Sequence, residues 1–267
     1  MPTYTGKTIV LTGASQGIGR ALALALAEQR PRLVLAARDR AALDLVAEEC
    51  RTRGAEVLVV PTDVAEEAQC RALLEQAVAR FKVVDVLVNN AGIGMIARFD
   101  ALPDLSVYAR LMKVNYLGCV YPTYYALPHL QASRGQIVVM ASLAGLTGVP
   151  TRTGYAASKH AVIGFFDSLR VELRGSGVGV TVVCPYFVKS EIHRRALGSD
   201  GKALGTTPMK EDRLMTAEEC ARLTVVAMEK RRRMLVMTAK GKLGRLLKLV
   251  APGLVDRIAE RAVQQGQ

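Results

Sequence analysis

Three polar residues in the second half of the chain have the types and spacing for proton-transfer chemistry. Tyr155 and Lys159 stand four positions apart, so on a helix both side chains lie on one face. A phenol titrates near pH ~10, too high for acid–base work at neutrality, and a neighbouring ammonium favours its phenolate form. Ser142 follows an apolar run, and its hydroxyl could hydrogen-bond the same substrate oxygen. The trio predicts proton exchange with an alcohol or carbonyl oxygen, although a Tyr–Lys pair alone is usually an exposed helical pair.

A glycine-rich segment near the N terminus, Thr12-Gly-Ala-Ser-Gln-Gly-Ile-Gly19, has the composition of a phosphate-binding turn. It lies between an apolar run typical of a buried strand and a helical pattern, which is the context such a turn requires. Glycines let the backbone approach a pyrophosphate, and a helix N terminus directs free N–H groups at it. The glycine spacing differs from the commoner GxGxxG. We predict that the segment binds a dinucleotide through Gly13, Ser15, Gln16, Gly17, Ile18 and Gly19.

The end of the second apolar run decides which dinucleotide is expected. An acidic residue there favours NAD by binding the ribose 2′-hydroxyl, whereas an arginine favours NADP by binding a 2′-phosphate. The run ends at Ala37 and is followed by Arg38, whose guanidinium pairs well with phosphate. Asp39 is better suited to capping the next helix. The sequence therefore predicts NADP(H), unless Arg38 is only a solvated surface charge.

The elements that must position these residues alternate along the chain. Apolar runs typical of buried strands cover residues 8–12, 32–37, 56–60, 85–89, 136–140, 178–184 and 234–237. Helical patterns cover residues 20–30, 40–53, 66–80, about 104–127, about 155–174 and 217–231. Such alternation implies crossover connections and a parallel sheet. With no linker, repeat or break in composition, we predict a single doubly wound α/β domain over residues 1–267, with about seven parallel strands flanked by helices.

Composition and charge bound the class of protein. Half of the 267 residues are hydrophobic and there is no Trp, which suits an aliphatic core of strands buried on both faces. A formal net charge of +12 is compatible with a nucleic acid, an anionic membrane, a phosphorylated ligand or simply a solvated basic surface. No nucleic-acid recognition motif accompanies this charge, so we expect no nucleic-acid partner.

The five cysteines are scattered and form no CxxC pair. That pattern argues against a disulfide framework and against a structural zinc site, so we expect reduced core thiols and no metal. The N terminus lacks the apolar region of a secretory signal, and no stretch approaches the ~18 apolar residues of a membrane span. We therefore expect a cytoplasmic protein, soluble or at most peripheral to a membrane.

Together the motifs resemble the short-chain dehydrogenase/reductase family from Thr8 to about Thr238. The resemblance rests on the glycine-rich segment, Asp63-Val64, Asn89-Asn-Ala-Gly92, Asn115, Ser142 and Tyr155-Ala-Ala-Ser-Lys159. It implies a Rossmann fold and a catalytic set of Asn115, Ser142, Tyr155 and Lys159. In this family the Asn binds a water that links the Lys to a proton relay. The alternative for Asn115 is a polar residue merely tolerated in a helix.

The resemblance also implies further contacts to cofactor and substrate. Asp63 and Val64 would contact the adenine ring, although Asp63 could be a plain turn residue. The other implied cofactor-binding residues are Asn90, Ala91, Gly92, Tyr155, Lys159, Pro185, Val188 and Ser190. Ser142 and Tyr155 would bind the substrate.

One segment around the expected pocket departs from the family pattern. The family usually has Pro-Gly after the sixth strand, whereas this chain has Pro185-Tyr186, which could alter nicotinamide placement or pocket shape. Residues 190–215 are the expected substrate lid. Met95, Ile96 and Phe187 hint at an apolar pocket, though core packing explains them about as well.

The C-terminal segment, residues 240–267, is predicted to be a basic amphipathic extension interrupted at Pro252. Its apolar face could lie on an anionic membrane, cover the substrate pocket or contact a neighbouring subunit. Membrane contact is the least favoured of these.

The sequence as a whole predicts an oxidoreductase that transfers a hydride between NADP(H) and a carbonyl or alcohol. The expected activity is reduction of a ketone or aldehyde with a fairly apolar body. The alternative is a dinucleotide-binding sensor or scaffold without turnover, against which the complete catalytic set argues. The family resemblance further implies a homodimer or homotetramer.

Overall fold

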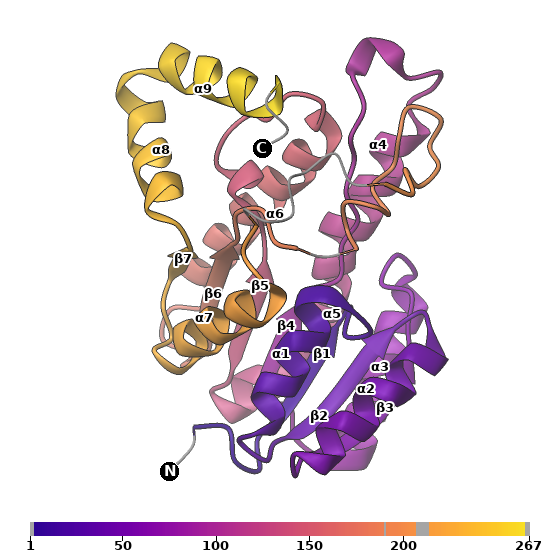
Figure 1. Ribbon diagram of the computed structural model, residues 1–267. Helices are drawn as coiled ribbons and strands as arrows, with labels where there is room; N and C mark the ends of the chain where they lie inside the picture. Colours follow the sequence, from indigo (N-terminus) through magenta and orange to yellow (C-terminus); the bar gives the residue numbers. More distant parts are fainter. Residues whose placement is uncertain (1–2, 190, 207–213, 265–267) are drawn as a thin grey trace.

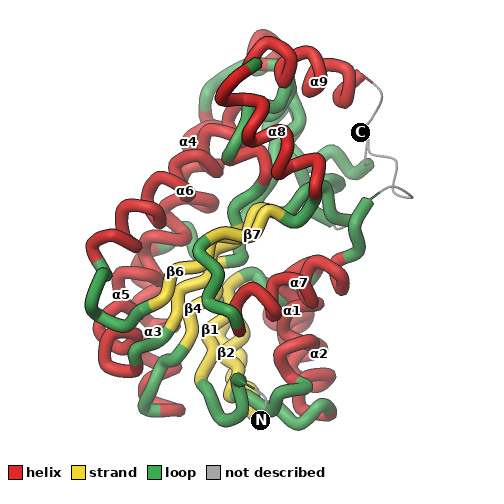
Figure 2. The backbone as a smooth tube through the Cα atoms, turned by 90° about the vertical axis from the view of Figure 1, so that its left-hand side faces the viewer, coloured by secondary structure: helices red, strands yellow, loops and turns green. Residues whose placement is uncertain are grey.

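The computed structural model describes residues 3–189, 191–206 and 214–264. Its centre is a sheet of seven parallel strands in the order β3-β2-β1-β4-β5-β6-β7. The strands are β1 (Thr8–Thr12), β2 (Arg32–Ala37), β3 (Glu56–Pro61), β4 (Val86–Asn89), β5 (Gln136–Met140), β6 (Gly179–Cys184) and β7 (Met234–Val236). Helices lie on both sides of the sheet (Figures 1 and 2). The predicted doubly wound α/β fold with seven parallel strands is confirmed.

The longer helices connect the strands or follow the last one. They are α1 (Gly17–Ala27), α2 (Arg40–Thr52), α3 (Glu67–Phe81), α4 (Ser106–Leu111), α5 (Gly118–Ser133), α6 (Thr153–Glu172), α7 (Ala217–Glu229), α8 (Ala239–Val250) and α9 (Pro252–Gln264). Helix α1 starts earlier than predicted, because the last glycines of the glycine-rich segment already form its first turn.

The central strands β1, β4 and β5 are buried on both faces, and successive side chains enter two different cores. On β1, Ile9 and Leu11 pack with α1, α2 and α7, whereas Val10 packs with α3, α5 and α6. This alternation follows from the two-residue period of a strand. It explains why the strands read as continuous apolar runs, since both of their faces need apolar residues.

The chain reverses its direction of winding between β1 and β4, which are neighbours in the sheet. Strands added after β1 lie on one side, and strands added after β3 lie on the other. At such a point the loops after two adjacent strands diverge and leave a crevice at the carboxyl edge of the sheet. Most of the predicted chemical residues follow the ends of β1 to β6, and Tyr155 and Lys159 lie near the start of α6. The fold therefore brings them to this one edge.

The predicted helix over residues 104–127 is divided in the structure. A π-helical turn, Met112–Leu117, joins α4 to α5, and α5 continues to Ser133. π-Turns of this kind occur frequently at functional sites. This one contains Asn115, which is fully buried.

The five cysteines are free and buried, as predicted. None of the helices that the structure describes is both long enough and apolar enough to cross a membrane.

Candidate active site

A cavity of about 1200 Å³ lies at the carboxyl edge of the sheet. Its walls are formed by the glycine-rich segment, the ends of β2 and β4–β6, the start of α6 and the α8–α9 region. The predicted site residues that line it are Gly13, Ser15, Gln16, Gly17, Ile18, Gly19, Arg38, Asp63, Val64, Asn90, Ala91, Gly92, Ser142, Tyr155, Lys159, Pro185 and Val188. Asn115 lies behind the wall, and Ser190 lies outside the described residues.

The glycine-rich segment is shaped by backbone conformations that favour glycine. Gly13 and Gly17 have φ values of 65° and 53°, in the left-handed region. A Cβ on Gly19 would lie 2.1 Å from the carbonyl oxygen of Gly13, so no side chain fits there without moving the backbone. Helix α1 begins without a side-chain cap or an acidic residue in its first turn. Its free N–H groups therefore suit the pyrophosphate of a nicotinamide dinucleotide.

The segment after β4 is tied to the glycine-rich segment. The Asn90 side-chain amide donates to the carbonyl oxygens of Thr12 and Gly13, each at 3.0 Å. The backbone N–H groups of Asn90 and Ala91 donate to Thr12 Oγ1 at 3.0 and 3.1 Å. These bonds hold two walls of the cavity at a fixed separation.

Two residues of opposite charge, Arg38 and Asp39, follow β2, and only Asp39 is engaged in capping a helix. The carboxylate of Asp39 accepts from the backbone N–H of Ala42 at 3.0 Å and caps α2. Arg38 is exposed and lines the cavity. The predicted capping role of Asp39 is therefore confirmed, and Arg38 is the cation at this end of the cavity. Asp63, on the same side, accepts from the N–H of Ala65 at 3.0 Å and also lines the cavity.

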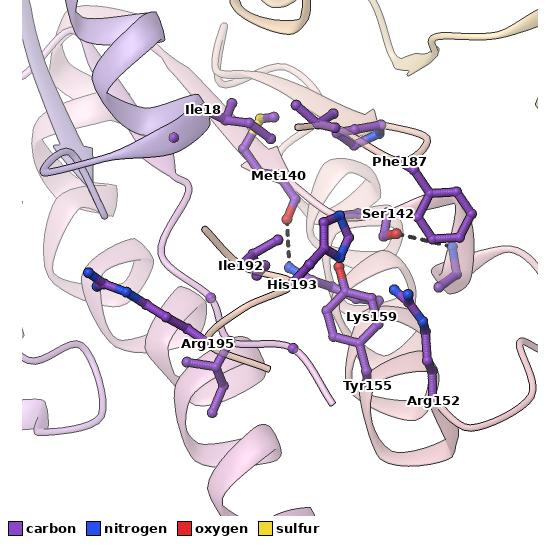
Figure 3. Close-up of a pocket in the computed structure, with 18 of the residues that line it drawn as sticks. Ile18, Met140, Ser142, Arg152, Tyr155, Lys159, Phe187, Ile192, His193 and Arg195 are labelled. Carbon is purple, nitrogen blue, oxygen red and sulfur yellow. Dashed lines mark hydrogen bonds between the residues drawn. The ribbon is translucent and has the colours of Figure 1, made fainter. Parts of the chain in front are cut away.

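Tyr155 and Lys159 lie near the start of α6, where Figure 3 shows them beside Ser142. The Lys159 ammonium is buried, donates to the carbonyl oxygen of Met140 at 2.8 Å and lies 5.9 Å from the Tyr155 ring centroid. Ser142 Oγ accepts from the N–H of Ala144 at 3.2 Å, which leaves its own proton available for donation. This arrangement can hydrogen-bond one substrate oxygen from two hydroxyls, with a cation behind one of them.

Asn115 is a structural link as well as a candidate relay residue. Its side chain exchanges hydrogen bonds with the backbone of Ile93, at 2.8 and 3.0 Å, and donates to Ser158 Oγ at 3.0 Å. It therefore ties the π-turn to the segment after β4 and to α6. A Cβ on Gly92 would lie 3.3 Å from Asn115 Oδ1 and 3.6 Å from Lys159 Nζ, so both side chains face the space beside Gly92. The water-binding role of Asn115 stays a prediction.

The segment after β6 forms an aromatic wall. Tyr186 is half-buried, and burial raises its pKa. Its ring packs edge-on against that of Phe187, with the two ring centroids 4.8 Å apart. Both rings line the cavity, and Tyr186 stands where the family usually has a glycine. The two aromatic side chains therefore form part of the cavity wall, and their effect on nicotinamide placement or pocket shape stays a prediction.

Arg152 is a cavity residue that the sequence analysis missed. It precedes α6, its guanidinium lies 4.9 Å from the Phe187 ring centroid, and burial lowers its pKa. Figure 3 shows it beside Tyr155, with His193 from the lid segment nearby. The only available signal was its position three residues before Tyr155, since an isolated arginine in a polar stretch has no distinctive pattern.

Met95 has the core-packing role that the sequence analysis gave as the alternative to a pocket wall. Met95 is 1% exposed and packs with Val107 and Leu111 in a small core, while Ile93 and Gly94 line the cavity instead. Phe187 does line it. The lid segment contributes Ile192 and Leu197, and part of that segment, residues 207–213, lies outside the described residues.

Comparison with known protein families and sequences gives consistent matches. Residues 7–199 match the family described as short chain dehydrogenase. A Dictyostelium discoideum protein named dehydrogenase/reductase SDR family protein 7-like is 33% identical over 265 residues, covering 97% of this chain and 82% of its own. An 11-beta-hydroxysteroid dehydrogenase A from Sesamum indicum is 40% identical over 212 residues, covering 79% of this chain and 61% of its own.

Two solved structures have the same fold. A short chain dehydrogenase/reductase from Burkholderia phymatum, in complex with NAD, has a TM-score of 0.83 and 30% identity and covers 95% of this chain and 96% of its own. An alcohol dehydrogenase from Thermococcus sibiricus, complexed with 5-hydroxy-NADP, has a TM-score of 0.74 and 27% identity and covers 84% and 90% of the two chains.

Proposed function

Because this chain belongs to the short-chain dehydrogenase/reductase family, we propose that it is an NADPH-dependent reductase of ketones or aldehydes with an apolar body. Membership makes it an oxidoreductase that acts on a CH–OH group with a nicotinamide dinucleotide. The choice of NADP(H), the direction of reduction and the class of substrate belong to the proposal.

The observation that carries the proposal is one cavity with Arg38 at one end and the Ser142–Tyr155–Lys159 set in another part. Arg38 supports NADP(H) because a guanidinium at the end of β2 suits a 2′-phosphate, while the nearest carboxylate is engaged in capping. The two solved structures carry NAD in one case and an NADP derivative in the other, so the preference rests on this chain's own residues.

Apolar side chains support an apolar substrate. Around the catalytic residues the cavity is lined by Ile93, Leu146, Val149, Ile192 and Leu197. Mostly apolar walls with a few convergent polar groups are typical of small-molecule sites. Burial of a hydrocarbon body there would provide binding energy, while Ser142 and Tyr155 would orient the carbonyl.

The proposed chemistry uses the chain's residues for proton transfer and orientation. When bound, NADPH supplies the hydride that the carbonyl carbon accepts. Tyr155 donates its phenolic proton to the carbonyl oxygen, and Ser142 donates a hydrogen bond to the same oxygen. The buried Lys159 ammonium stabilises the phenolate left on Tyr155.

The test is NADPH consumption across aldehydes, ketones and oxosteroids with Tyr155→Phe beside the wild type. We expect turnover to fall by about 10²–10⁴-fold, since this is the usual contribution of a positioned acid. NADPH binding, followed by its fluorescence, should persist. Tyr124→Phe is the matched control, because Tyr124 is 70% exposed and lies outside the cavity wall.

Full activity in Tyr155→Phe would exclude Tyr155 as the acid. NADPH binding without turnover on any carbonyl, in wild type and variant alike, would instead favour the sensor or scaffold function.

A further inference from the structure

Helix α8 carries an apolar stripe on its outer side, which we define as Leu243, Leu246, Leu249 and Val250. These side chains are 60%, 63%, 80% and 82% exposed. Their spacing of three, three and one residues places them on one face of the helix. Four adjacent exposed apolar side chains form a patch that calls for a partner, unlike single surface leucines.

The opposite side of α8 is firmly attached to the protein. Thr238 Oγ1 accepts from the N–H of Gly241 at 3.1 Å and caps the helix. A Cβ on Gly241 would lie 3.1 Å from both Leu143 and Val236, so the helix approaches β7 closely. Lys248 donates to the carbonyl oxygen of Leu146 at 3.2 Å. The exposed stripe is therefore a fixed outer face and not the result of a detached helix.

All the charged residues of α8 are positively charged. The structure describes the whole helix, which has four cations, Lys240, Lys242, Arg245 and Lys248, and no acidic residue. Three of these cations are exposed, and Lys242 stands directly before the apolar stripe. An apolar face bordered by cations is complementary to a layer of anionic lipid headgroups above hydrocarbon.

The helix that carries the stripe also forms part of the cavity wall. Lys240, Gly241, Gly244 and Arg245 of α8 line the cavity, as do Val255, Ile258 and Ala259 of α9. Ile258 is also 54% exposed, so its side chain forms part of an apolar rim. Figures 1 and 2 show both helices at the end of the molecule away from the N terminus, beyond the carboxyl ends of the strands.

We propose that α8 docks on the surface of an anionic lipid membrane, with the apolar stripe at the boundary between headgroups and acyl chains. A second copy of the chain fits less well, because two such helices face to face would bring cations together without acidic partners on either helix. Docking in this orientation places the cavity rim next to the bilayer. An apolar carbonyl compound dissolved in lipid could then enter the cavity without crossing water.

The test is co-sedimentation of the full chain with phosphatidylcholine vesicles, prepared with and without phosphatidylserine. We expect binding to be at least about tenfold stronger with phosphatidylserine, and to weaken markedly at about 1 M salt because exposed charges are screened. Leu246→Glu should reduce binding by about tenfold or more, and Lys242→Glu by a smaller factor. Leu45→Glu is the matched control, since Leu45 is 70% exposed on α2.

Equal sedimentation with both kinds of vesicle, or none with either, would overturn the proposal. So would unchanged binding of Leu246→Glu. A dimer detected by light scattering that becomes a monomer in Leu246→Glu would assign the stripe to a second copy instead. The proposal does not rest on hydride transfer, because vesicle binding is measured without substrate or cofactor.

Discussion

The sides of the helices that face the two cores and the outer face of α8 both consist of apolar residues at helical spacing, yet their surroundings are opposite. Phe166 on α6 is completely buried, whereas Leu249 on α8 is 80% exposed. The periodic pattern predicts the helix and its apolar face in both cases. Which surface packs against that face depends on other parts of the molecule or on a partner, and the sequence of the helix does not indicate it.

The two regions also differ in charge. The core-facing sides of α1, α5 and α6 contain almost no ionised groups, and the exception, Lys159, lies in the candidate active site. On α8 cations adjoin the apolar stripe. A buried face excludes charge because desolvation is costly, while a face that meets water or headgroups can carry it.

Replacement of a core side chain should give the largest loss of stability. Phe166→Ala removes a fully buried ring from the core beside α6, and we expect a cost of about 3–5 kcal/mol because a cavity remains. Urea unfolding followed by far-ultraviolet circular dichroism measures it. A cost well below this range would mean that the core repacks and is not the rigid region described above.

Loss of the cation at the end of β2 should have the next largest effect, on binding alone. Arg38→Gln should weaken the binding of NADPH by about 1.5–3 kcal/mol, which is the usual range for hydrogen bonds to charged groups. The binding of NADH should be nearly unchanged. The exposed position of Arg38 means that stability should not change. Titration of cofactor fluorescence gives both affinities. Equal weakening of the two cofactors would contradict the proposed NADP(H) preference.

Alkaline pH should weaken the cores through their buried thiols. Burial raises the pKa of Cys184 to about 12 from an ordinary value of 9.0. Above pH 9 the unfolded chain releases this proton while the native chain retains it, so stability is full below pH 9 and falls as pH rises. Urea midpoints at pH 7 and pH 10 measure the loss, which Cys184→Ala should reduce by about 1 kcal/mol. An identical loss in the variant would rule out this thiol as a source.

The smallest effect is expected on the outer face of α8. Leu249→Ala should change the free energy of unfolding by less than about 0.5 kcal/mol, since the side chain is 80% exposed and loses little packing. The same urea assay applies. A loss similar to that of Phe166→Ala would show that another surface covers Leu249 in solution, and the contrast between the two regions would fail.

Most of the fold was predictable because strands buried on both faces produce unmistakable apolar runs. The runs that became β1 and β2 matched the observed strands, and the strand–helix alternation gave the parallel sheet. The π-turn was not predictable. It depends on the hydrogen bonds of Asn115 with Ile93, which is distant in sequence, and local periodicity carries no information about such contacts.

The candidate site was predictable where the residues that perform one chemical task stand together in a short motif. The glycine-rich segment and the Tyr155–Lys159 pair combine residue type, spacing and position in one stretch of sequence. Arg152 and the aromatic wall at Tyr186 and Phe187 have no such internal signature. They approach each other only because α6 begins at the edge of the sheet where β6 ends, so a three-dimensional contact is needed to recognise them.

Helix α6 has a consequence for the lifetime of the protein when it is heated. Its first turns hold Tyr155 and Lys159, and later turns hold Phe166 in the core, so one continuous helix supports both. If the turns that pack in the core detach, the first turns of the same helix lose their position as well. Heat inactivation should therefore coincide with global melting, without a folded but inactive species between them. The half-life of activity at high temperature would then report directly on the rate at which the whole sheet unfolds.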